Sequence, residues 1–553
     1  MKKNTRRQVA DTWDRGESQA IIDQLWSLRG RMLETEAALA PHLERVSPVY
    51  RASARNLAHY LALRQDDRRP LQEWLAWVGL SSLGRAESHV LANLDKVIGI
   101  LHRLTGQPWQ PRPQDEPAGI QSSRKLLEQH TAELLGVPPP GRAVRIMVTL
   151  PSEAAGDFGL IRGLVDSGMD IARINCAHDG PAEWKAMAAN VRRAARALRR
   201  PVRILMDLGG PKLRTGPIAQ GPAVLKLRPL RDELGRVLAP ARIGIRVAGA
   251  TLPVDAAPVH IGVDAEWLDQ LETGDCLDLT DARGADRSLV VVRRDEAGVL
   301  ADCAQTAYLV PETRLKRRRK GHMPRSSILS DLPCHEGTLH LERGGTLHLT
   351  RGVAVQPVLK GQGERHQSVP TVACTLPEVF EQVSVGERVW FDDGRIGGVI
   401  RRVEPEWLEV EITNARDSGE KLAGDKGINL PDSQLDLPAL TDKDIEDLAV
   451  VAKEADLVGL SFVHRAADIE TLRACLRDLG APDLGIVLKI ETRRGFENLP
   501  QLLFSAMASN AAGVMIARGD LAVECGYERL AEVQEEILWA AEAAHMPDRK
   551  SVV

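Results

Sequence analysis

Apolar residues recur along this chain at two spacings, and the spacing changes from one segment to the next. In the first 140 residues it is helical, with apolar positions three and four residues apart. Proline-rich stretches near residues 108–117 and 138–140 interrupt it. We expect a small α-helical domain followed by a linker, with helices in the ranges Ala20–Ala40, Arg51–Leu63, Leu71–Val78, Glu87–Leu104 and Ile120–Leu135.

Short β-rich runs begin after residue 141 and alternate with helical patterns. The early runs are Val144–Leu150, Gly168–Asn175 and Val202–Met206. The same alternation returns at 437–547, with expected strands at 456–461, 485–489 and 512–517. Strands separated by single helices favour an α/β fold with a parallel sheet. We therefore expect a (β/α)8 barrel of the TIM type, of which about six βα units are present.

The segment 217–436 interrupts this alternation and is typical of an all-β domain. It contains short runs of alternating polarity separated by turn residues. Examples are Val224–Leu227, Leu277–Leu279, Ser288–Val292, Thr346–Leu349 and Arg388–Phe391. Glu266–Asp275 also resembles Glu378–Glu387, which predicts a duplicated domain. The alternative is two unrelated β-segments with similar turns. We expect the basic run Lys316–Lys320 to be a solvated loop, with an anionic effector site as the alternative.

Composition excludes several classes of protein. The 553 residues carry a net charge of −4 and only 4% aromatic residues, which favours neither nucleic-acid attraction nor base stacking. The seven cysteines form no Cys-x-x-Cys pair, so neither a zinc site nor a disulfide framework is indicated. No apolar run is long enough to span a membrane. We expect a cytoplasmic protein without nucleic-acid or membrane partners. The oligomeric state is left open, with a homo-oligomer as one expectation.

The strongest candidate chemistry lies at the ends of two expected strands. Lys489 and Glu491 follow the run Ile486–Leu488, and Asp520 follows Gly513–Ile516. In parallel barrels the functional residues sit at the carboxyl ends of the strands. Two carboxylates suit Mg²⁺, and a neighbouring lysine can stabilise a phosphoryl group during its transfer. The alternative is an ion pair with a purely structural role.

These residues belong to a series of motifs that resembles the pyruvate kinase family. Met169–His178 is similar to the family's Arg-x-Asn-x-Ser-His strand, and Asp207–Gly216 is similar to its Asp-Thr-Lys-Gly-Pro-Glu-Ile-Arg-Thr-Gly loop. Further similar segments follow in the family's order: Phe391–Gly394, Asp425–Pro431, Leu437–Asp444, Leu460–Val463, Leu488–Glu491 and Ala517–Leu521. The resemblance covers about 144–217 and 375–546, and it makes the inserted β-domain an enlarged lid.

The resemblance implies phosphoryl transfer from phosphoenolpyruvate to ADP, giving pyruvate and ATP. It implies Lys489 as the catalytic residue, with Mg²⁺ (or Mn²⁺) bound by Glu491 and Asp520. Arg173, Gly519 and Asp520 would bind the substrate. The implied nucleotide-binding residues are His178, Arg214 and Lys426, and the implied monovalent-cation ligands are Asn175, Asp207 and the carbonyl of Leu208.

Two departures from the family pattern concern the monovalent cation. Ala177 stands where the family has a serine ligand, and Lys212 stands where it often has glutamate. An ammonium held near the cation pocket can supply the charge that K⁺ otherwise provides. We therefore expect activity that does not require K⁺, the cation site being a vestige for which Lys212 substitutes. Gly209 also replaces a family lysine, which removes one expected phosphate contact.

The expected domains are therefore 1–140 (helical extension and linker), 141–216 (first part of the barrel), 217–436 (lid), 437–547 (second part of the barrel) and 548–553. The last six residues resemble nothing in the family, and one back-translation of them matches a common sequencing adapter. We expect an artefactual tail on a truncated barrel, an arrangement that would impair the folding or the activity of this chain even where its parent is an enzyme. Two rival interpretations are a catalytically silent, metabolite-sensing relative and an aldolase-type barrel; ADP-dependent pyruvate formation separates them from a kinase.

Overall fold

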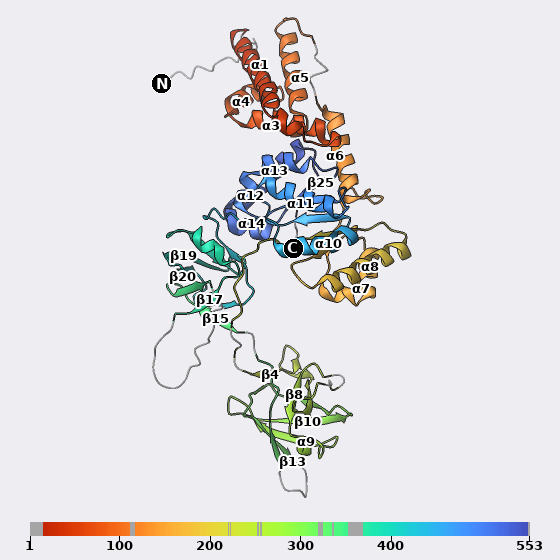
Figure 1. The fold of residues 1–553 in the computed structure, drawn as a ribbon, viewed down its shortest axis with the longest axis vertical. Helices are drawn as coiled ribbons and strands as arrows, with labels where there is room; N and C mark the ends of the chain where they lie inside the picture. The colour runs from red at the N-terminus through yellow and green to blue at the C-terminus, as the bar shows by residue number, and fades with distance from the viewer. Residues whose placement is uncertain are drawn as a thin grey trace, which may run out of the picture. The chain divides into compact units, whose positions relative to one another are not determined.

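The computed structural model describes residues 15–110, 117–218, 221, 223–251, 254, 257–318, 325–334, 337–351 and 369–550. It divides into two compact units, drawn in Figure 1 and considered one at a time below. The first unit combines Met1–Leu213, Glu378–Pro405 and Gly427–Val553, and the second combines Arg214–Pro377 and Glu406–Lys426.

The first unit begins with the helical extension that the apolar spacing predicts. Its helices are α1 (Arg15–Ala38), α2 (Ala40–Leu43), α3 (Arg51–Arg64), α4 (Arg69–Trp77), α5 (Val90–Leu104) and α6 (Ile120–Leu135). The apolar side of α1 is buried, with Leu25, Leu28 and Met32 fully inaccessible to solvent. Burial of such a stripe, more than intrinsic propensity, stabilises a helix of this kind.

The helical extension is joined to the barrel segment through a shared core and buried hydrogen bonds. The hydroxyl of Tyr50, on the turn before α3, donates to the carbonyl of Ala512 at 3.2 Å and accepts from its amide at 3.1 Å. Asn56 of α3 donates to the carbonyl of Ala543 at 2.9 Å. One apolar cluster contains residues of both segments. The extension is therefore an integral part of this unit.

The barrel segment forms a parallel sheet of seven strands among the described residues. Their order is β1-β2-β3-β23-β24-β25-β26. The bounds are β1 (Met147–Thr149), β2 (Ile171–Asn175), β3 (Arg203–Asp207), β23 (Leu457–Leu460), β24 (Gly485–Ile490), β25 (Ala512–Ile516) and β26 (Asp548–Lys550). The α/β class with a parallel half-barrel is confirmed.

The seventh strand, β26, was not among the six strands that the sequence predicts. Asp548–Lys550, which we expected to lie in a foreign tail, forms β26 and pairs in parallel with β25 from Val514 to Ile516. The backbone of this segment supplies hydrogen bonds to the edge of β25, irrespective of its side chains. Residues 551–553 lie outside the described part of the chain.

Helices connect the strands as the alternation predicts. They are α7 (Phe158–Asp166), α8 (Pro181–Leu198), α10 (Asp442–Glu454), α11 (Ala466–Asp478), α12 (Arg493–Glu497), α13 (Leu499–Ala506), α14 (Arg518–Cys525) and α15 (Leu530–Ala543). The alternation predicts one helix between the expected strands 485–489 and 512–517. The structure has two helices there, α12 and α13, and Pro500 lies in the first turn of α13. The short helix α14 was not predicted.

Three antiparallel β-strands also belong to the first unit. Strand β18 (Arg388–Phe391) pairs with β19 (Ile396–Val403) and with β22 (Ile428–Asn429). The turn between β18 and β19 contains Asp392, Asp393 and Gly394, all with positive φ. Asp and Gly tolerate this backbone conformation better than other residues do, which explains their presence in the turn.

The second unit is all-β apart from the short helix α9 (Ala265–Leu268). Its largest sheet has the order β14-β13-β9-β10-β11-β7-β8. The bounds are β14 (Ser326–Ile328), β13 (Arg314–Arg318), β9 (Cys276–Thr280), β10 (Asp286–Arg294), β11 (Val299–Cys303), β7 (Ala241–Val247) and β8 (His260–Val263). An apolar cluster that includes Leu277, Leu289 and Leu315 fills one side.

The remaining described strands of this unit pair in small groups. The pairs are β4–β12, β5–β6, β15–β21, β16–β17 and β16–β20. Their bounds are β4 (Leu225–Leu227), β5 (Leu230–Arg231), β6 (Val237–Ala239), β12 (Ala307–Leu309), β15 (Thr338–Leu341), β16 (Thr346–Thr350), β17 (Thr371–Ala373), β20 (Trp407–Asn414) and β21 (Glu420–Ala423). The expected strands of the inserted segment are confirmed.

One expectation for this segment was wrong. The basic run that we expected to be a loop lies in β13 as far as Arg318, with Leu315 buried and Lys316 exposed; residues 319 and 320 are outside the described part. The two similar segments lead into β9 and β18 respectively, each followed by a hairpin. Duplication of the domain stays a prediction.

No helix in the described ranges combines the length and the hydropathy needed to cross a bilayer.

Candidate active site

The carboxyl ends of five parallel strands meet at one edge of the sheet. In the strand register Asn175 lies level with Asp207, and Asp207 with Gly459. Leu460 is level with Leu488, and Ile490 with Ile516. This alignment places the polar residues that follow β2, β3, β23, β24 and β25 beside one another, as expected for a barrel-type site.

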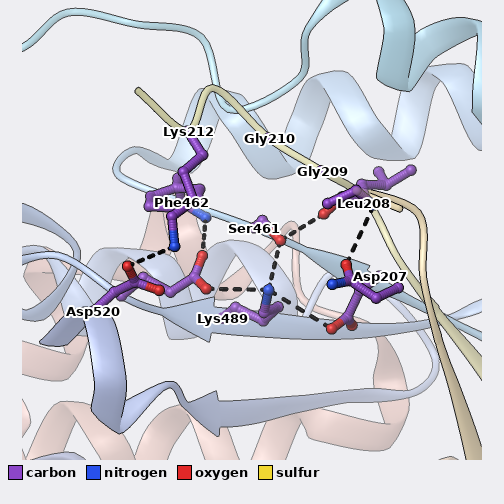
Figure 2. A network of polar contacts seen from close by, with 12 residues as sticks. Asp207, Leu208, Gly209, Gly210, Lys212, Ser461, Phe462, Lys489 and Asp520 are labelled. Carbon is purple, nitrogen blue, oxygen red and sulfur yellow. Dashed lines mark hydrogen bonds and ion pairs between the residues drawn. The ribbon is translucent and has the colours of Figure 1, made fainter. Parts of the chain in front are cut away.

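Lys489 lies at the centre of this edge and is only 6% exposed. Its Nζ donates to Ser461 Oγ at 2.7 Å and lies 3.7 Å from Asp207 Oδ2 (Figure 2). The same Nζ lies 3.1 Å from Glu491 Oε1. Burial lowers the pKa of Lys489, but the charges of Glu491 and Asp207 outweigh burial and hold the pKa above its ordinary value. Lys489 therefore presents a permanent positive charge.

Glu491 is buried beside Lys489 and is held by the backbone. The amide of Phe462 donates to Glu491 Oε2 at 2.7 Å. Burial raises the pKa of Glu491, and the charge of Asp520 raises it further, although Lys489 acts in the opposite direction. A cation bound near the two carboxylates would relieve their mutual repulsion.

Asp207 is fully buried and interacts with two cationic side chains, those of Arg173 and Lys489. It accepts a hydrogen bond from Arg173 Nε, while Arg173 Nη1 donates to Thr149 Oγ1 at 3.0 Å. A Cβ atom at Gly459 would lie 2.0 Å from Asp207 Oδ1. The strand therefore needs glycine at 459 because the carboxylate occupies the space of a side chain.

The loop after β3 is fixed by contacts with the ends of β23 and α10. Ser461 Oγ donates to the carbonyl of Leu208 at 2.7 Å (Figure 2). The amides of Gly209 and Gly210 donate to the carboxylate of Asp444. Asp444 also belongs to the capping box with Thr441 that begins α10. One acidic side chain thus fixes both the helix start and the glycine loop.

Lys212 extends from the same loop to a second carboxylate. Its Nζ donates to Asp520 Oδ1 at 2.9 Å (Figure 2). Asp520 and Gly519 lie in the first turn of α14. The first backbone N–H groups of a helix have no partner within the helix and favour anions. The ammonium of Lys212, which we expected to substitute for the monovalent cation, thus lies beside Asp520.

The expected monovalent-cation ligands already have protein partners. Asn175 Oδ1 accepts from the amide of Ala177 at 3.3 Å. The carbonyl of Leu208 accepts from Ser461, and Asp207 binds Arg173 and Lys489. These contacts agree with a cation site that has lost its original occupant, and that role stays a prediction.

The two residues expected to bind the divalent metal, Glu491 and Asp520, are both carboxylates. In the described part of the chain, no group of three or more His, Cys, Asp or Glu side chains is arranged to hold a metal ion. Mg²⁺ often uses only one or two carboxylates and completes its shell with water and substrate oxygens. Glu491 and Asp520, which interact electrostatically, fit that requirement.

The three expected nucleotide-binding residues are divided between the units. Arg214 and Lys426 belong to the second unit, where Arg214 Nη1 donates to the carbonyl of Asp425 and the Lys426 amide donates to Thr215 Oγ1. His178 belongs to the first unit, and its carbonyl accepts from Trp184 Nε1 at 2.9 Å. Their roles stay predictions.

Sequence reasoning missed three residues that organise this site. Ser461 links Lys489 to the Leu208 carbonyl, Asp444 fixes the glycine loop, and Thr149 supports Arg173. Ser461 and Thr149 each lie at the carboxyl end of a strand, which is a usable signal. From the sequence, Asp444 is predicted only as a helix-capping residue. Its contact with the glycine loop depends on tertiary structure.

The fold and the site together define a class: a barrel-type α/β protein with a buried lysine and paired carboxylates at the strand ends. Comparison with known proteins narrows the class. Residues 141–233 and 312–548, more than half of the chain, match the family model "Pyruvate kinase, barrel domain". The chain belongs to the pyruvate kinase family.

Individual relatives agree with this assignment. The chain is 32% identical over 229 residues to pyruvate kinase PKLR of Homo sapiens, which covers 41% of this chain and 36% of that protein. It is 37% identical over 190 residues to pyruvate kinase of Chlamydia pneumoniae (32% and 37%) and 32% identical over 177 residues to that of Bacillus licheniformis (32% and 29%). It spans about a third of the length of these relatives.

Proposed function

We propose that this protein transfers a phosphoryl group from phosphoenolpyruvate to ADP. In that reaction the bond between phosphorus and the enol oxygen breaks, and a bond forms between phosphorus and a terminal oxygen of ADP. The enolate left behind takes up a proton to give pyruvate. The observation that carries the proposal is the buried ammonium of Lys489, held by Ser461, Glu491 and Asp207 at the ends of the strands.

Lys489 is the proposed catalytic residue. Phosphoryl transfer spreads negative charge over the equatorial oxygens of the transferring group, and positioned cations stabilise that charge. The contacts of Lys489 fix its ammonium before the substrates arrive, so that little reorganisation is needed in the reaction. Asp207 and Ser461 act as positioning residues for Lys489.

Glu491 and Asp520 are the proposed ligands of Mg²⁺, with Mn²⁺ as a substitute. When bound, the ion would neutralise charge on the substrate oxygens. Arg173 is proposed to bind the phosphate of phosphoenolpyruvate, for which a guanidinium is well suited. The free N–H groups of the first turn of α14, including that of Gly519, are proposed to bind the substrate carboxylate.

The nucleotide is proposed to contact His178, Arg214 and Lys426. Support comes from the resemblance of their segments to family motifs. We also propose that K⁺ is not required, because Lys212 supplies a fixed positive charge at Asp520. A homo-oligomeric state and a cytoplasmic location remain predictions.

The test is ADP-dependent pyruvate formation, measured by coupling to lactate dehydrogenase. Lys489→Met is expected to lower kcat by about 10²–10³-fold, the usual loss on removing one positioned charge-stabilising group. Lys453→Met, which changes an exposed lysine on α10, is the matched control and should leave the rate unchanged. Equal rates for the wild type and Lys489→Met would exclude the proposed role. Phosphoenolpyruvate binding without turnover would instead favour the silent-relative interpretation.

A further inference from the structure

A cavity of about 410 Å³ lies in the first unit next to the site described above. Its lining includes Lys212 and Phe462, whereas Lys489, Glu491 and Asp520 do not line it. The other walls come from the loop after β22, the segment after β23, and α12. The proposed reaction uses none of the polar side chains of these other walls.

His464 lines this cavity and is only 7% exposed. Within the described part of the chain, neither ring nitrogen of His464 has a hydrogen-bond partner. The backbone of His464 is held firmly, because its amide donates to Asp468 Oδ2 at 3.0 Å and its carbonyl accepts from Asn498 Nδ2 at 2.8 Å. A buried polar group without a partner is costly and requires an explanation.

Burial lowers the pKa of the His464 imidazole to about 4, so that the ring is neutral at pH 7. Nearby charges act in both directions, with Asp468 and Asp436 raising the pKa and Arg494 and Arg465 lowering it. A neutral imidazole offers one N–H donor and one acceptor. A hydroxyl group, which is itself both donor and acceptor, complements either nitrogen.

Arg494 supplies a positive charge to the same cavity. Its Nη1 donates to the carbonyl of Leu435 at 2.7 Å. No ion pair joins Arg494 to a carboxylate in the described ranges, whereas the neighbouring Arg493 is paired with Glu497 at 2.8 Å. The lining cation Lys212 is likewise paired, with Asp520. The guanidinium of Arg494 is therefore available to an anion.

The acidic residues of the cavity do little to repel an anion. Asp432 is paired with Arg388 at 2.7 Å. Glu524 accepts from Asn429 Nδ2 at 3.0 Å, and burial raises the pKa of Glu524 to about 7. At neutral pH this carboxyl is therefore protonated for a large fraction of the time.

We propose that this cavity binds a small hydroxylated organic anion, whose anionic group pairs with Arg494 and whose hydroxyl group bonds to His464. The occupant contacts two residues that touch the catalytic groups. The Phe462 amide binds Glu491, and Lys212 binds Asp520. The cavity is therefore separated from each of the two proposed metal ligands by a single residue. The binding itself does not depend on the proposed function.

Isothermal titration calorimetry of the full chain with three probes tests this assignment. L-malate carries hydroxyl and carboxylate groups, glycerol 3-phosphate carries hydroxyl and phosphate groups, and succinate is the malate analogue without the hydroxyl. Saturable millimolar or tighter binding of at least one hydroxylated probe is expected. Malate should bind more tightly than succinate if the carboxylate is the recognised anion; preference for glycerol 3-phosphate assigns phosphate instead.

Two variants locate the binding. Arg494→Gln and His464→Phe should each weaken binding of the better probe by about tenfold or more, which corresponds to one strong hydrogen bond. Arg477→Gln on α11 and His42→Phe on α2 change exposed residues of the same kinds and should have no effect. Arg494 is partly exposed, whereas His464 is buried. Arg494→Gln is therefore expected to fold, and it tests the assignment even if His464→Phe does not fold.

Three results would overturn the assignment. The first is the absence of saturable binding by all three probes at millimolar concentrations. The second is binding that Arg494→Gln leaves unchanged. The third is binding that Lys489→Met abolishes while Arg494→Gln preserves it, because the probe would then occupy the catalytic site.

Discussion

At the scale of single residues, the site depends on where side chains are absent as much as on where they are present. A Cβ atom at Gly459 would lie 2.0 Å from Asp207 Oδ1, whereas a Cβ atom at Gly519 has no atom within 4 Å. The two glycines therefore have different explanations. Gly459 makes room for a buried carboxylate, and Gly519 leaves open the space in which the substrate carboxylate is proposed to bind.

Alanine at each of these positions separates the two explanations. Gly459→Ala should destabilise the fold by about 1–3 kcal/mol through overpacking. Gly519→Ala should leave the free energy of unfolding unchanged or raise it slightly, since alanine is the better helix former, yet lower kcat/KM for phosphoenolpyruvate. Urea unfolding and steady-state kinetics on both variants provide the measurement. Unimpaired kcat/KM in Gly519→Ala would argue against substrate binding at this turn.

Lys212 allows a second residue-scale prediction. Its ammonium lies 2.9 Å from Asp520 Oδ1, so it supplies a fixed positive charge beside a proposed metal ligand. Wild-type activity should be similar in K⁺ and in tetramethylammonium buffers, while Lys212→Glu should become dependent on K⁺. The ratio of kcat in the two buffers is the measurement. A large fall in the wild-type rate without K⁺ would contradict the proposed role of Lys212.

At the scale of elements, the sequence predicted the strands and helices that carry strong periodicity. Lys489, Glu491 and Asp520 could be placed at strand ends because short apolar runs precede them. Several elements were not predicted correctly. Pro500 divides a helix, and the short helix α14 was not expected. Strand β13 contains charged residues on either side of the buried Leu315, and β26 has no apolar pattern of its own.

Contacts between elements were beyond sequence reasoning for a physical reason. Ser461 bonds to Lys489 only because β23 and β24 are neighbours in the sheet, and the unpartnered ring of His464 is a property of the assembled walls. Periodicity reports which face of an element is buried, but not which side chain lies opposite. The same holds for the packing of the helical extension on the barrel segment.

That packing leads to a prediction for the helical extension. Tyr50 is fully buried, and its hydroxyl makes two hydrogen bonds to the backbone of Ala512 in β25. Tyr50→Phe removes the hydroxyl, so the amide and the carbonyl of Ala512 both lose this partner, and the free energy of unfolding should fall by about 1–3 kcal/mol. The exposed Tyr527, which makes a single hydrogen bond, provides the control variant Tyr527→Phe, with a much smaller expected effect. Equal effects in urea titrations would show that the contact of Tyr50 does not stabilise the unit.

At the scale of the whole molecule, the chain combines a barrel segment with a helical extension in one unit and β-sheets in the other. Buried neutral histidines link the stability of the first unit to pH. His545 is fully buried and bonds to Ser53 Oγ and to the carbonyl of Ser88. Burial, reinforced by His130 and His89, lowers its pKa from 6.5 to about 4.

The direction of the pH effect follows from proton binding. Below pH 6.5 the unfolded chain protonates His545 while the folded chain does not, so acid favours unfolding. The stabilisation from neutral His545 is complete above pH 6.5 and is lost as the pH falls towards 4, amounting to about 2 kcal/mol between pH 7 and pH 5. His545→Asn, which tolerates the positive φ of this position, should reduce that pH dependence by a similar amount. Urea titrations at the two pH values measure it, and an unchanged slope would contradict the assignment.

We propose that the buried lysine and the two carboxylates support the transfer of a phosphoryl group from phosphoenolpyruvate to ADP. The most direct measurement follows the phosphorus atom itself by ³¹P NMR, in a mixture of the protein, phosphoenolpyruvate, ADP and Mg²⁺. The phosphoenolpyruvate resonance should decline as the γ-phosphate resonance of ATP grows, and neither change should occur with Lys489→Met or without Mg²⁺. An unchanged spectrum, or conversion to inorganic phosphate without ATP, would contradict this proposal.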